Sequence, residues 1–205
     1  MKDSLPTLYY VHDPMCSWCW GFRPVWHEVQ MALSGKVTIQ FLLGGLAPDT
    51  QEPMPEIIQR SIRSTWKKIQ REIPGTEFNY NFWTQCQPRR STYPACRAVI
   101  ACRMQQPESE QKMLSAIQQA YYLEARNTSD VEILIDLADK IGLDVQRFTE
   151  DIRSESCQNI LTGEIQFCRD IGIQSFPGLV LKHGKSYTLL DFDYASSNVI
   201  LDQIS

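Results

Sequence analysis

Two cysteines three positions apart, Cys16 and Cys19, are the residues whose types and spacing best suit covalent chemistry. A short run of β-branched and aromatic residues at 8–11 predicts a strand, and the Asp-Pro pair at 13–14 is typical of the turn that ends one. Apolar residues then recur at helical spacing over 17–34. The pair therefore lies at a strand-to-helix junction, with Cys16 at the N-terminus of the helix.

This position favours a reactive thiolate at Cys16. The first turn of a helix has unpaired backbone N–H groups and the positive end of the helix dipole, and both stabilise a negative charge. Cysteines so placed titrate at roughly 3.5 to 7.5 instead of about 8.5. Cys19 lies one turn deeper on the same side, within bonding reach but away from those N–H groups. We expect Cys16 to be acidic and to attack a disulfide, and Cys19 to resolve the product.

Three other uses of a C-x-x-C pair fit the sequence less well. A structural zinc site needs two further ligands, and neither the three histidines nor the other cysteines supply a closely spaced pair. Covalent haem attachment requires a histidine directly after the second cysteine, where Trp20 stands. A disulfide that closes so short a loop contributes little chain entropy. We therefore expect a redox dithiol and no metal.

Three segments of the chain, taken in order, match the sequence pattern of a known family. The first, Asp13 to Phe22, surrounds the two cysteines; the second begins at Pro94; the third, Gly172 to Leu181, contains Phe176-Pro177. Together they resemble the DsbA-like thioredoxin-fold oxidoreductases, in particular the cytoplasmic FrnE-like branch. The resemblance implies an α/β protein with a thioredoxin-like fold and a large all-helical insertion.

The periodicity of the remaining chain agrees with this fold. A β-branched run at 37–43 predicts a second strand, so the N-terminal part forms a βαβ unit. Two further strands, at 178–182 and 186–190, and a helix at 195–204 close the chain. We expect a thioredoxin-like domain formed by residues 1–46 and 171–205, with residues 47–170 as an inserted helical domain. The helices expected within that insertion lie at 56–72, 92–104, 107–124, 131–141, 144–154 and 155–169. For the aromatic-rich stretch 77–86 the sequence leaves two alternatives, a short helix or a loop that covers another part of the protein.

The resemblance also implies a substrate-binding surface. The family's proline is cis, so we expect Pro177 to follow a cis bond, with the backbone N–H and C=O of Phe176 free to pair with an extended substrate. Trp18 and Tyr93 are expected to bind substrate as parts of an apolar surface around Cys16, to which Met15 and Trp20 also contribute.

Redox tuning is expected from the neighbours of the dithiol. The two residues between the cysteines supply no cation, unlike the pair in periplasmic DsbA, which favours a less extreme oxidant. Ser17 can offer Cys16 a hydroxyl hydrogen bond. His12 is a second tuning candidate because histidine titrates near neutral pH.

Composition limits location and partners. The chain has 205 residues, 43% of them hydrophobic, and a formal net charge of −4, which argues against a nucleic-acid partner. No apolar stretch is long enough to span a membrane and the N-terminus has no apolar signal core, so we expect a cytoplasmic protein without a membrane partner. Cytosolic thiols are kept reduced. The five other cysteines, expected to be inert core thiols without an assigned role, are Cys86, Cys96, Cys102, Cys157 and Cys168.

These observations predict a thiol-disulfide oxidoreductase, acting as a protein disulfide oxidase or isomerase or as a reductase. Its substrates are thiol- or disulfide-containing proteins or peptides, and a cellular thiol reductant or oxidant recycles it. No cofactor is needed, with glutathione an optional co-substrate. One alternative is a glutathione-dependent isomerase or transferase of the 2-hydroxychromene-2-carboxylate isomerase or kappa type, against which the presence of Cys19 argues. Another is a peptide-binding holdase without redox turnover. The sequence leaves substrate, redox direction and oligomeric state open.

Overall fold

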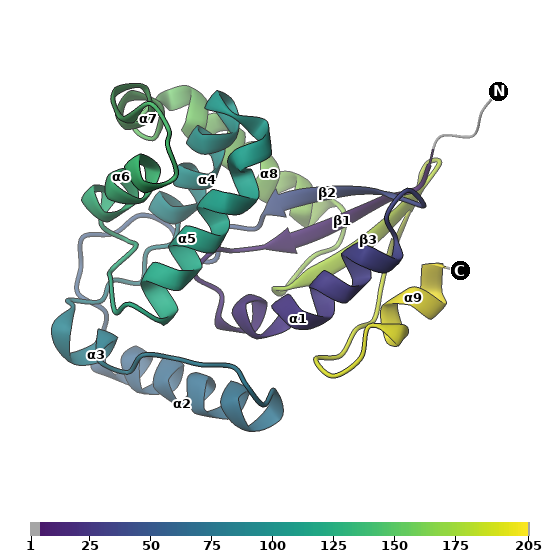
Figure 1. The fold of residues 1–205 in the computed structure, drawn as a ribbon, viewed down its shortest axis with the longest axis horizontal. Helices are drawn as coiled ribbons and strands as arrows, with labels where there is room; N and C mark the ends of the chain where they lie inside the picture. Colours follow the sequence, from purple (N-terminus) through teal and green to yellow (C-terminus); the bar gives the residue numbers. More distant parts are fainter. Residues whose placement is uncertain (1–4, 205) are drawn as a thin grey trace.

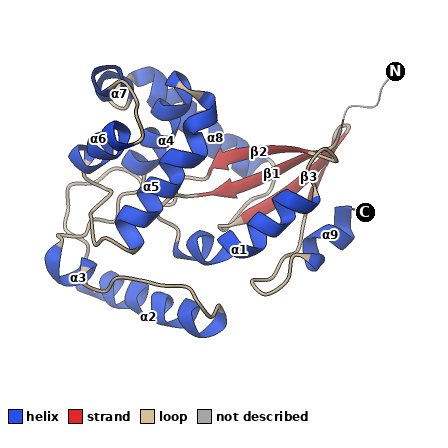
Figure 2. Cartoon of the chain, in the orientation of Figure 1, coloured by secondary structure: helices blue, strands red, loops and turns tan. Residues whose placement is uncertain are grey.

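A four-stranded mixed sheet joins the two ends of the chain in the computed structural model, which describes residues 5–204. Its strands lie in the order β2-β1-β3-β4. The central strand β1 (Thr7–His12) pairs in parallel with β2 (Thr38–Leu43) and antiparallel with β3 (Gly178–His183), and β3 pairs antiparallel with the edge strand β4 (Ser186–Leu189). The predicted βαβ unit and C-terminal hairpin are both confirmed, as is the α/β, thioredoxin-like fold class (Figure 2).

Helices occupy the chain between β2 and β3. They are α2 (Glu56–Glu72), α3 (Phe82–Gln85), α4 (Tyr93–Gln105), the 3-10 turn Pro107–Ser109, α5 (Glu110–Tyr122), α6 (Val131–Lys140), α7 (Val145–Asp151) and α8 (Glu155–Asp170). Most of the aromatic-rich stretch 77–86 is loop, with α3 within it. None of the helices in the described residues is both long and apolar enough to cross a membrane.

The last helix, α9 (Asn198–Ile204), begins three residues later than predicted. The carboxylate of Asp193 accepts hydrogen bonds from the backbone N–H groups of Ala195 and Ser196, at 2.8 and 2.7 Å. These bonds hold the chain in an Asx turn, which competes with helical hydrogen bonding. The first helical hydrogen bonds come after this turn, from the N–H groups of Ile200 and Leu201 to the carbonyl of Ser197.

The sheet is covered on both faces. Successive side chains of β1 point to opposite sides: Tyr10 packs with α1 (Ser17–Ala32) and α9, whereas Val11 packs with the end of α8. The carboxyl ends of β1 and β2 point towards the helices of the inserted segment (Figure 1). The turn after β1, which carries Cys16, therefore lies between the sheet and the helical block.

Helix α8 belongs to the predicted insertion but covers one face of the sheet. Its Cys168 is part of the core on that face. Its Glu164 accepts a hydrogen bond from the backbone N–H of Leu43 at the end of β2, at 2.8 Å, and also pairs with Arg103 of α4. The helix thus connects sheet and helical block, and the division into two domains stays a prediction.

The core of the helical block reaches the start of α1. Trp66 is fully buried and stacks on Phe78 with ring centroids 4.7 Å apart. Its indole N–H donates to Ser17 Oγ at 2.8 Å. Trp20, one turn further along α1, stacks on Tyr122 of α5 at 5.1 Å. The N-terminal turn of α1 is therefore held by aromatic side chains from α2 and α5.

Candidate active site

Cys16 occupies the N-cap position of α1, where the sequence predicted it. Its φ and ψ angles are −79° and 113°, and its Sγ accepts a hydrogen bond from the backbone N–H of Cys19 at 3.4 Å. Both side chains are enclosed, with 5% of Cys16 and 1% of Cys19 exposed. Cys16 nevertheless lines a cavity, and Cys19 does not. Access to the dithiol is therefore through Cys16.

The two thiols differ in their electrostatic surroundings. Burial raises the pKa of the Cys19 thiol well above its usual value, and the adjacent Cys16 raises it further. The sulfur of Cys16, in contrast, receives a backbone N–H at the positive end of a 16-residue helix. This asymmetry matches the predicted order in which Cys16 attacks and Cys19 follows.

The loop before β3 faces Cys16 across the cavity. The Phe176-Pro177 peptide bond is cis, as the resemblance implied. The prediction that the backbone carbonyl of Phe176 is free is wrong for the dithiol form of the protein. In that form the Cys16 thiol donates to this carbonyl oxygen at 3.5 Å. The ring of Phe176 packs so closely on Gly44 that a Cβ at position 44 would overlap it. Glycine at 44 thus makes room for the aromatic residue before the proline.

A cavity of about 430 Å³ lies next to Cys16. Its wall comes from the start of α1, the loop after β2, α2, the loop before α4, α5 and the loop before β3. The side chains that line it are Met15, Cys16, Ser17, Trp18, Leu46, Met54, Ser61, Ile62, Thr65, Arg89, Arg90, Ser91, Thr92, Tyr121, Gln174, Ser175 and Phe176. Arg89 and Arg90 were missed from the sequence, although two adjacent arginines directly before a predicted helix are a visible signal.

Asp13 was taken from the sequence as turn punctuation, but it is the central polar group beneath the site. It is completely buried, and its Oδ1 accepts from the backbone N–H of Met15 at 2.8 Å. Its Oδ2 accepts from the backbone N–H of Leu46 at 2.7 Å and the hydroxyl of Thr92 at 2.6 Å, with the Cys96 thiol at 3.5 Å. Asp13 therefore ties the turn that carries Cys16 to the loop after β2 and to α4.

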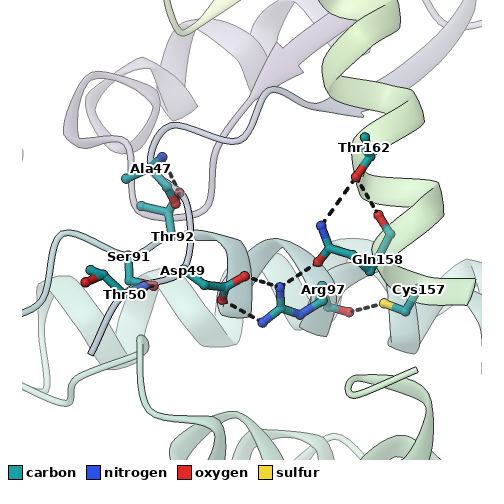
Figure 3. Close-up of polar contacts among 9 residues, drawn as sticks. All are labelled: Ala47, Asp49, Thr50, Ser91, Thr92, Arg97, Cys157, Gln158 and Thr162. Atoms are coloured by element: carbon teal, nitrogen blue, oxygen red, sulfur yellow. Dashed lines mark hydrogen bonds and ion pairs between the residues drawn. The ribbon is translucent and has the colours of Figure 1, made fainter. Parts of the chain in front are cut away.

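An ion pair extends this link along α4 (Figure 3). The guanidinium of Arg97 donates to both carboxylate oxygens of Asp49, at 2.7 and 2.8 Å, and to Gln158 of α8 at 2.8 Å. Next to it, the backbone N–H of Ala47 donates to Thr92 Oγ1 at 3.0 Å. The loop after β2 is thus fixed on α4 and α8, which sets the cavity wall formed by Leu46 and Thr92.

The predicted substrate-binding aromatic residues separate into two groups. Trp18 is half-buried, lines the cavity and contacts Tyr194 at 5.0 Å. Trp20 is not part of that surface, because it is buried with its indole N–H donating to the carbonyl of Glu77 at 3.0 Å. Tyr93 does not line the cavity either; its ring lies against Gly45. Of Trp18 and Tyr93, the two aromatic residues predicted to bind substrate, only Trp18 remains a candidate for substrate contact.

Ser17 and the five remaining cysteines have mainly structural surroundings. Ser17 Oγ accepts from Trp66, and the structure gives it no hydrogen bond to Cys16. Four of the cysteines are buried, as expected, but Cys86 is only half-buried and donates to the carbonyl of Ala125 at 3.0 Å. Among residues 5–204, no three His, Cys, Asp or Glu side chains are grouped so as to hold a metal ion.

His12 does not line the cavity beside Cys16 but another one, next to Tyr10 and Phe41, and its role as a tuning group stays a prediction. Its ring is 1% exposed and stacks on Tyr10 with centroids 5.2 Å apart. Neither ring nitrogen has a hydrogen-bond partner in the described chain. Burial, and secondarily the charge of Arg103, lowers its pKa to about 3. His12 is therefore neutral in the native protein at physiological pH.

This burial predicts a loss of stability in mild acid. Below about pH 6.5 the unfolded chain binds a proton at His12 that the native state takes up only near pH 3, so stability falls as the pH falls between these values. From pH 7 to pH 5 the wild type should lose about 2 kcal/mol of unfolding free energy more than His12→Phe. Urea denaturation at both pH values measures this difference. The matched change at exposed His27, His27→Phe, should retain the wild-type pH dependence; parallel curves for wild type and His12→Phe would contradict the prediction.

Comparison with known proteins agrees with the fold. The chain belongs to the thioredoxin family, whose model matches residues 9–191. Its fold is shared by solved DsbA oxidoreductases, which are less than 25% identical to it in sequence. A candidate protein disulfide isomerase from Nitrosomonas europaea superposes with a TM-score of 0.84 at 29% identity, covering 98% of this chain and 96% of that one. The cytosolic disulfide reductase DsbM from Pseudomonas aeruginosa shares the fold, with a TM-score of 0.73 at 22% identity and coverage of 90% and 89%.

Curated relatives carry a different description. The ClpXP adapter protein SpxH of Halalkalibacterium halodurans is 25% identical over 179 residues, which cover 84% of this chain and 57% of that protein. The SpxH of Bacillus subtilis is 22% identical over 173 residues, 84% of this chain and 56% of its own length. The chain thus spans little more than half the length of these relatives. The family match and the fold place the chain in the thioredoxin class of proteins.

Proposed function

We propose that this chain is a thiol-disulfide oxidoreductase that acts on peptide and protein disulfides by exchange at Cys16 and Cys19. One observation carries the proposal: Cys16 caps α1, opens to the cavity and contacts the cis-proline loop, while Cys19 lies buried one turn behind it. A nucleophilic thiol at a substrate cavity and a protected second thiol are the two parts that exchange requires.

The reaction balances with the two thiols alone. The Cys16 thiolate attacks one sulfur of the substrate disulfide, forms a mixed disulfide, and the other substrate sulfur leaves as a thiolate. Cys19 then attacks Cys16 Sγ, releasing the second substrate thiol and forming the Cys16–Cys19 disulfide. The substrate gains two electrons, which the dithiol loses. Two equivalents of a cellular thiol return the protein to the dithiol form, and the reverse sequence oxidises a substrate.

The raised pKa of Cys19 favours its reaction after Cys16, the thiol that lines the cavity, has bound a substrate. Part of its rise comes from the charge of Cys16. Once Cys16 is bound in a mixed disulfide, that charge is gone and the Cys19 thiol loses its proton more readily. Resolution is thereby delayed until a substrate is attached.

The retained second thiol also favours exchange over single-thiol isomerase chemistry, which needs no resolving group. The recycling thiol in our proposal is a low-molecular-weight thiol such as glutathione in a cytoplasmic setting; a structure of the fold neighbour DsbM with glutathione supports this choice by analogy. No further cofactor enters the proposed reaction.

The proposal is tested by equilibrating the protein in glutathione buffers and measuring the fraction of Cys16–Cys19 disulfide by alkylation and mass spectrometry. We expect one reversible two-electron couple with a potential below the value of about −120 mV known for DsbA, because no cation lies between the cysteines. The couple should vanish in Cys16→Ser. The absence of a Cys16–Cys19 disulfide at every buffer ratio would refute the proposal.

A second candidate function is that of a ClpXP adapter. It is favoured by the curated SpxH relatives, which align with 84% of this chain. Binding of ClpXP by a Cys16→Ser/Cys19→Ser double variant would support an adapter role without redox turnover. A wild-type chain that exchanges disulfides and does not bind ClpXP would exclude it.

A further inference from the structure

The cavity beside Cys16 has a positive wall. Arg89 and Arg90 line it, and none of the other lining residues is an Asp or Glu. Lys68 lies near the cavity, with its Nζ 5.5 Å from the centroid of the Trp18 ring, but it does not line it and pairs with Glu72 at 3.8 Å. The chain as a whole has a net charge of −4. The cavity therefore attracts a negatively charged ligand against the overall charge of the protein.

The two arginines differ in what they already bind. Arg89 Nη2 donates to Asp130 Oδ1 at 2.6 Å and to the carbonyl of Ser129 at 2.8 Å, and 17% of its side chain is exposed. Arg90 is exposed and has no hydrogen bond or ion pair with any described residue. Arg89 is thus a fixed part of the wall, and Arg90 is available to a ligand.

The rest of the wall suits a peptide. Apolar side chains of Met15, Trp18, Ile62 and Phe176 face the same space as the Cys16 sulfur. The backbone N–H of Phe176 has no partner among the described residues, so it can pair with an extended chain. A volume of about 430 Å³ holds a short peptide segment, within the range of ligand sites.

We propose that this cavity selects peptide disulfides with a carboxylate next to the reacting cysteine, and that Arg90 is the specificity-determining residue that binds this carboxylate. The inference rests on the proposed exchange function and names its substrate class. Arginine is suited to the role because its planar guanidinium holds a carboxylate by two parallel hydrogen bonds. The apolar wall takes the neighbouring side chain of the same peptide.

The test compares three disulfide peptides that differ only in the residue next to the cysteine, which is Glu, Gln or Lys. The second-order rate constant of their reduction by the dithiol protein is followed by chromatography of the released thiol. The Glu peptide should react at least about tenfold faster than the Lys peptide, because even one of the two charge-assisted hydrogen bonds is worth about a factor of ten. Arg90→Gln should lower this ratio to about twofold or less, and Arg90→Glu should reverse it.

Two controls separate recognition from other effects. Arg169→Gln removes the same charge from an exposed position of α8 outside the cavity and should retain the tenfold ratio. Alkylation of Cys16 by uncharged iodoacetamide reports thiolate reactivity alone. Its rate should change much less in Arg90→Gln than the Glu-peptide rate; an equal fall in both would mean that Arg90 acts on the thiol and would overturn the inference.

The remaining outcomes are also decisive. Equal rates for the three peptides with the wild type, or an unchanged ratio in Arg90→Gln, would overturn the role of Arg90 while leaving disulfide exchange intact. An effect of Arg90→Gln on oxidised glutathione but on none of the three test peptides would overturn the assignment to peptides other than glutathione. A wild-type protein that reduces no disulfide at all would instead refute the proposed function.

Discussion

Replacing Cys16 with serine should reduce disulfide exchange to the rate of the reaction without protein, whereas Cys19→Ser should stop after the first attack. The serine hydroxyl is not ionised at neutral pH and cannot replace the thiolate that Cys16 provides at the N-cap of α1. In Cys19→Ser the nucleophile remains, but nothing resolves the mixed disulfide. Reduction of a peptide disulfide by the prereduced protein, with intact-mass spectrometry of the products, measures both effects.

Cys86→Ser is the matched control for these variants. Cys86 is only half-buried, and a serine hydroxyl can donate to the carbonyl of Ala125 in its place. Exchange should therefore continue at the wild-type rate. A mixed disulfide that accumulates on Cys16→Ser instead of Cys19→Ser would invert the assigned roles, and full activity in both variants would exclude the mechanism.

Asp13→Ala should produce the largest loss of stability among single changes near the site, about 3 kcal/mol of unfolding free energy. The substitution leaves the N–H groups of Met15 and Leu46 without an acceptor, and the hydroxyl of Thr92 keeps only a long contact of 3.4 Å to the carbonyl of Ala47. A buried donor without a partner costs about 1–3 kcal/mol. The substitution also removes the cost of burying the Asp13 carboxylate, which offsets part of that sum. This cost is seen in the pKa of Asp13, which burial raises. Urea denaturation measures the net effect.

The size of the loss should depend on how many acceptors remain. Asp13→Asn keeps one carbonyl oxygen but turns an amide N–H₂ towards a donor, so its cost should fall between those of wild type and Asp13→Ala. Asp202→Asn, at an exposed position of α9, should change stability by less than about 0.5 kcal/mol. A cost for Asp13→Ala no greater than that of Asp202→Asn would show that the bonds of Asp13 contribute little to stability.

The local sequence was sufficient for most of the secondary structure. The helical spacing over 56–72 predicted α2 to the residue, because an amphipathic pattern ending at Ile-Pro-Gly specifies both the helix and its end. The run of β-branched and aromatic residues at 8–11 and the turn at 13–14 placed Cys16 at the start of α1. The error at α9 also has a local cause, since Asp193 binds the backbone N–H groups of the first two residues of the predicted helix, Ala195 and Ser196.

The candidate site could be predicted only in part. The dithiol and its position were determined by the sequence itself, and the resemblance to a family supplied the cis bond before Pro177. Trp18 reaches the cavity, but Tyr93 does not. Both are aromatic residues near a helix start, so nothing in their local sequence separates them. Their difference arises from the close packing of Tyr93 on Gly45 after the chain has folded.

By itself, then, the sequence determined the helices and strands, their order along the chain and the pair Cys16 and Cys19. Each of these depends on the spacing of residues that lie within a few positions of one another. Only the tertiary structure decided the burial of Asp13 beneath that pair and the position of Arg90 at its cavity. The groups that Asp13 binds at Leu46 and Thr92 are 33 and 79 residues away along the chain. Such contacts depend on packing between distant segments, which no local pattern of residues encodes.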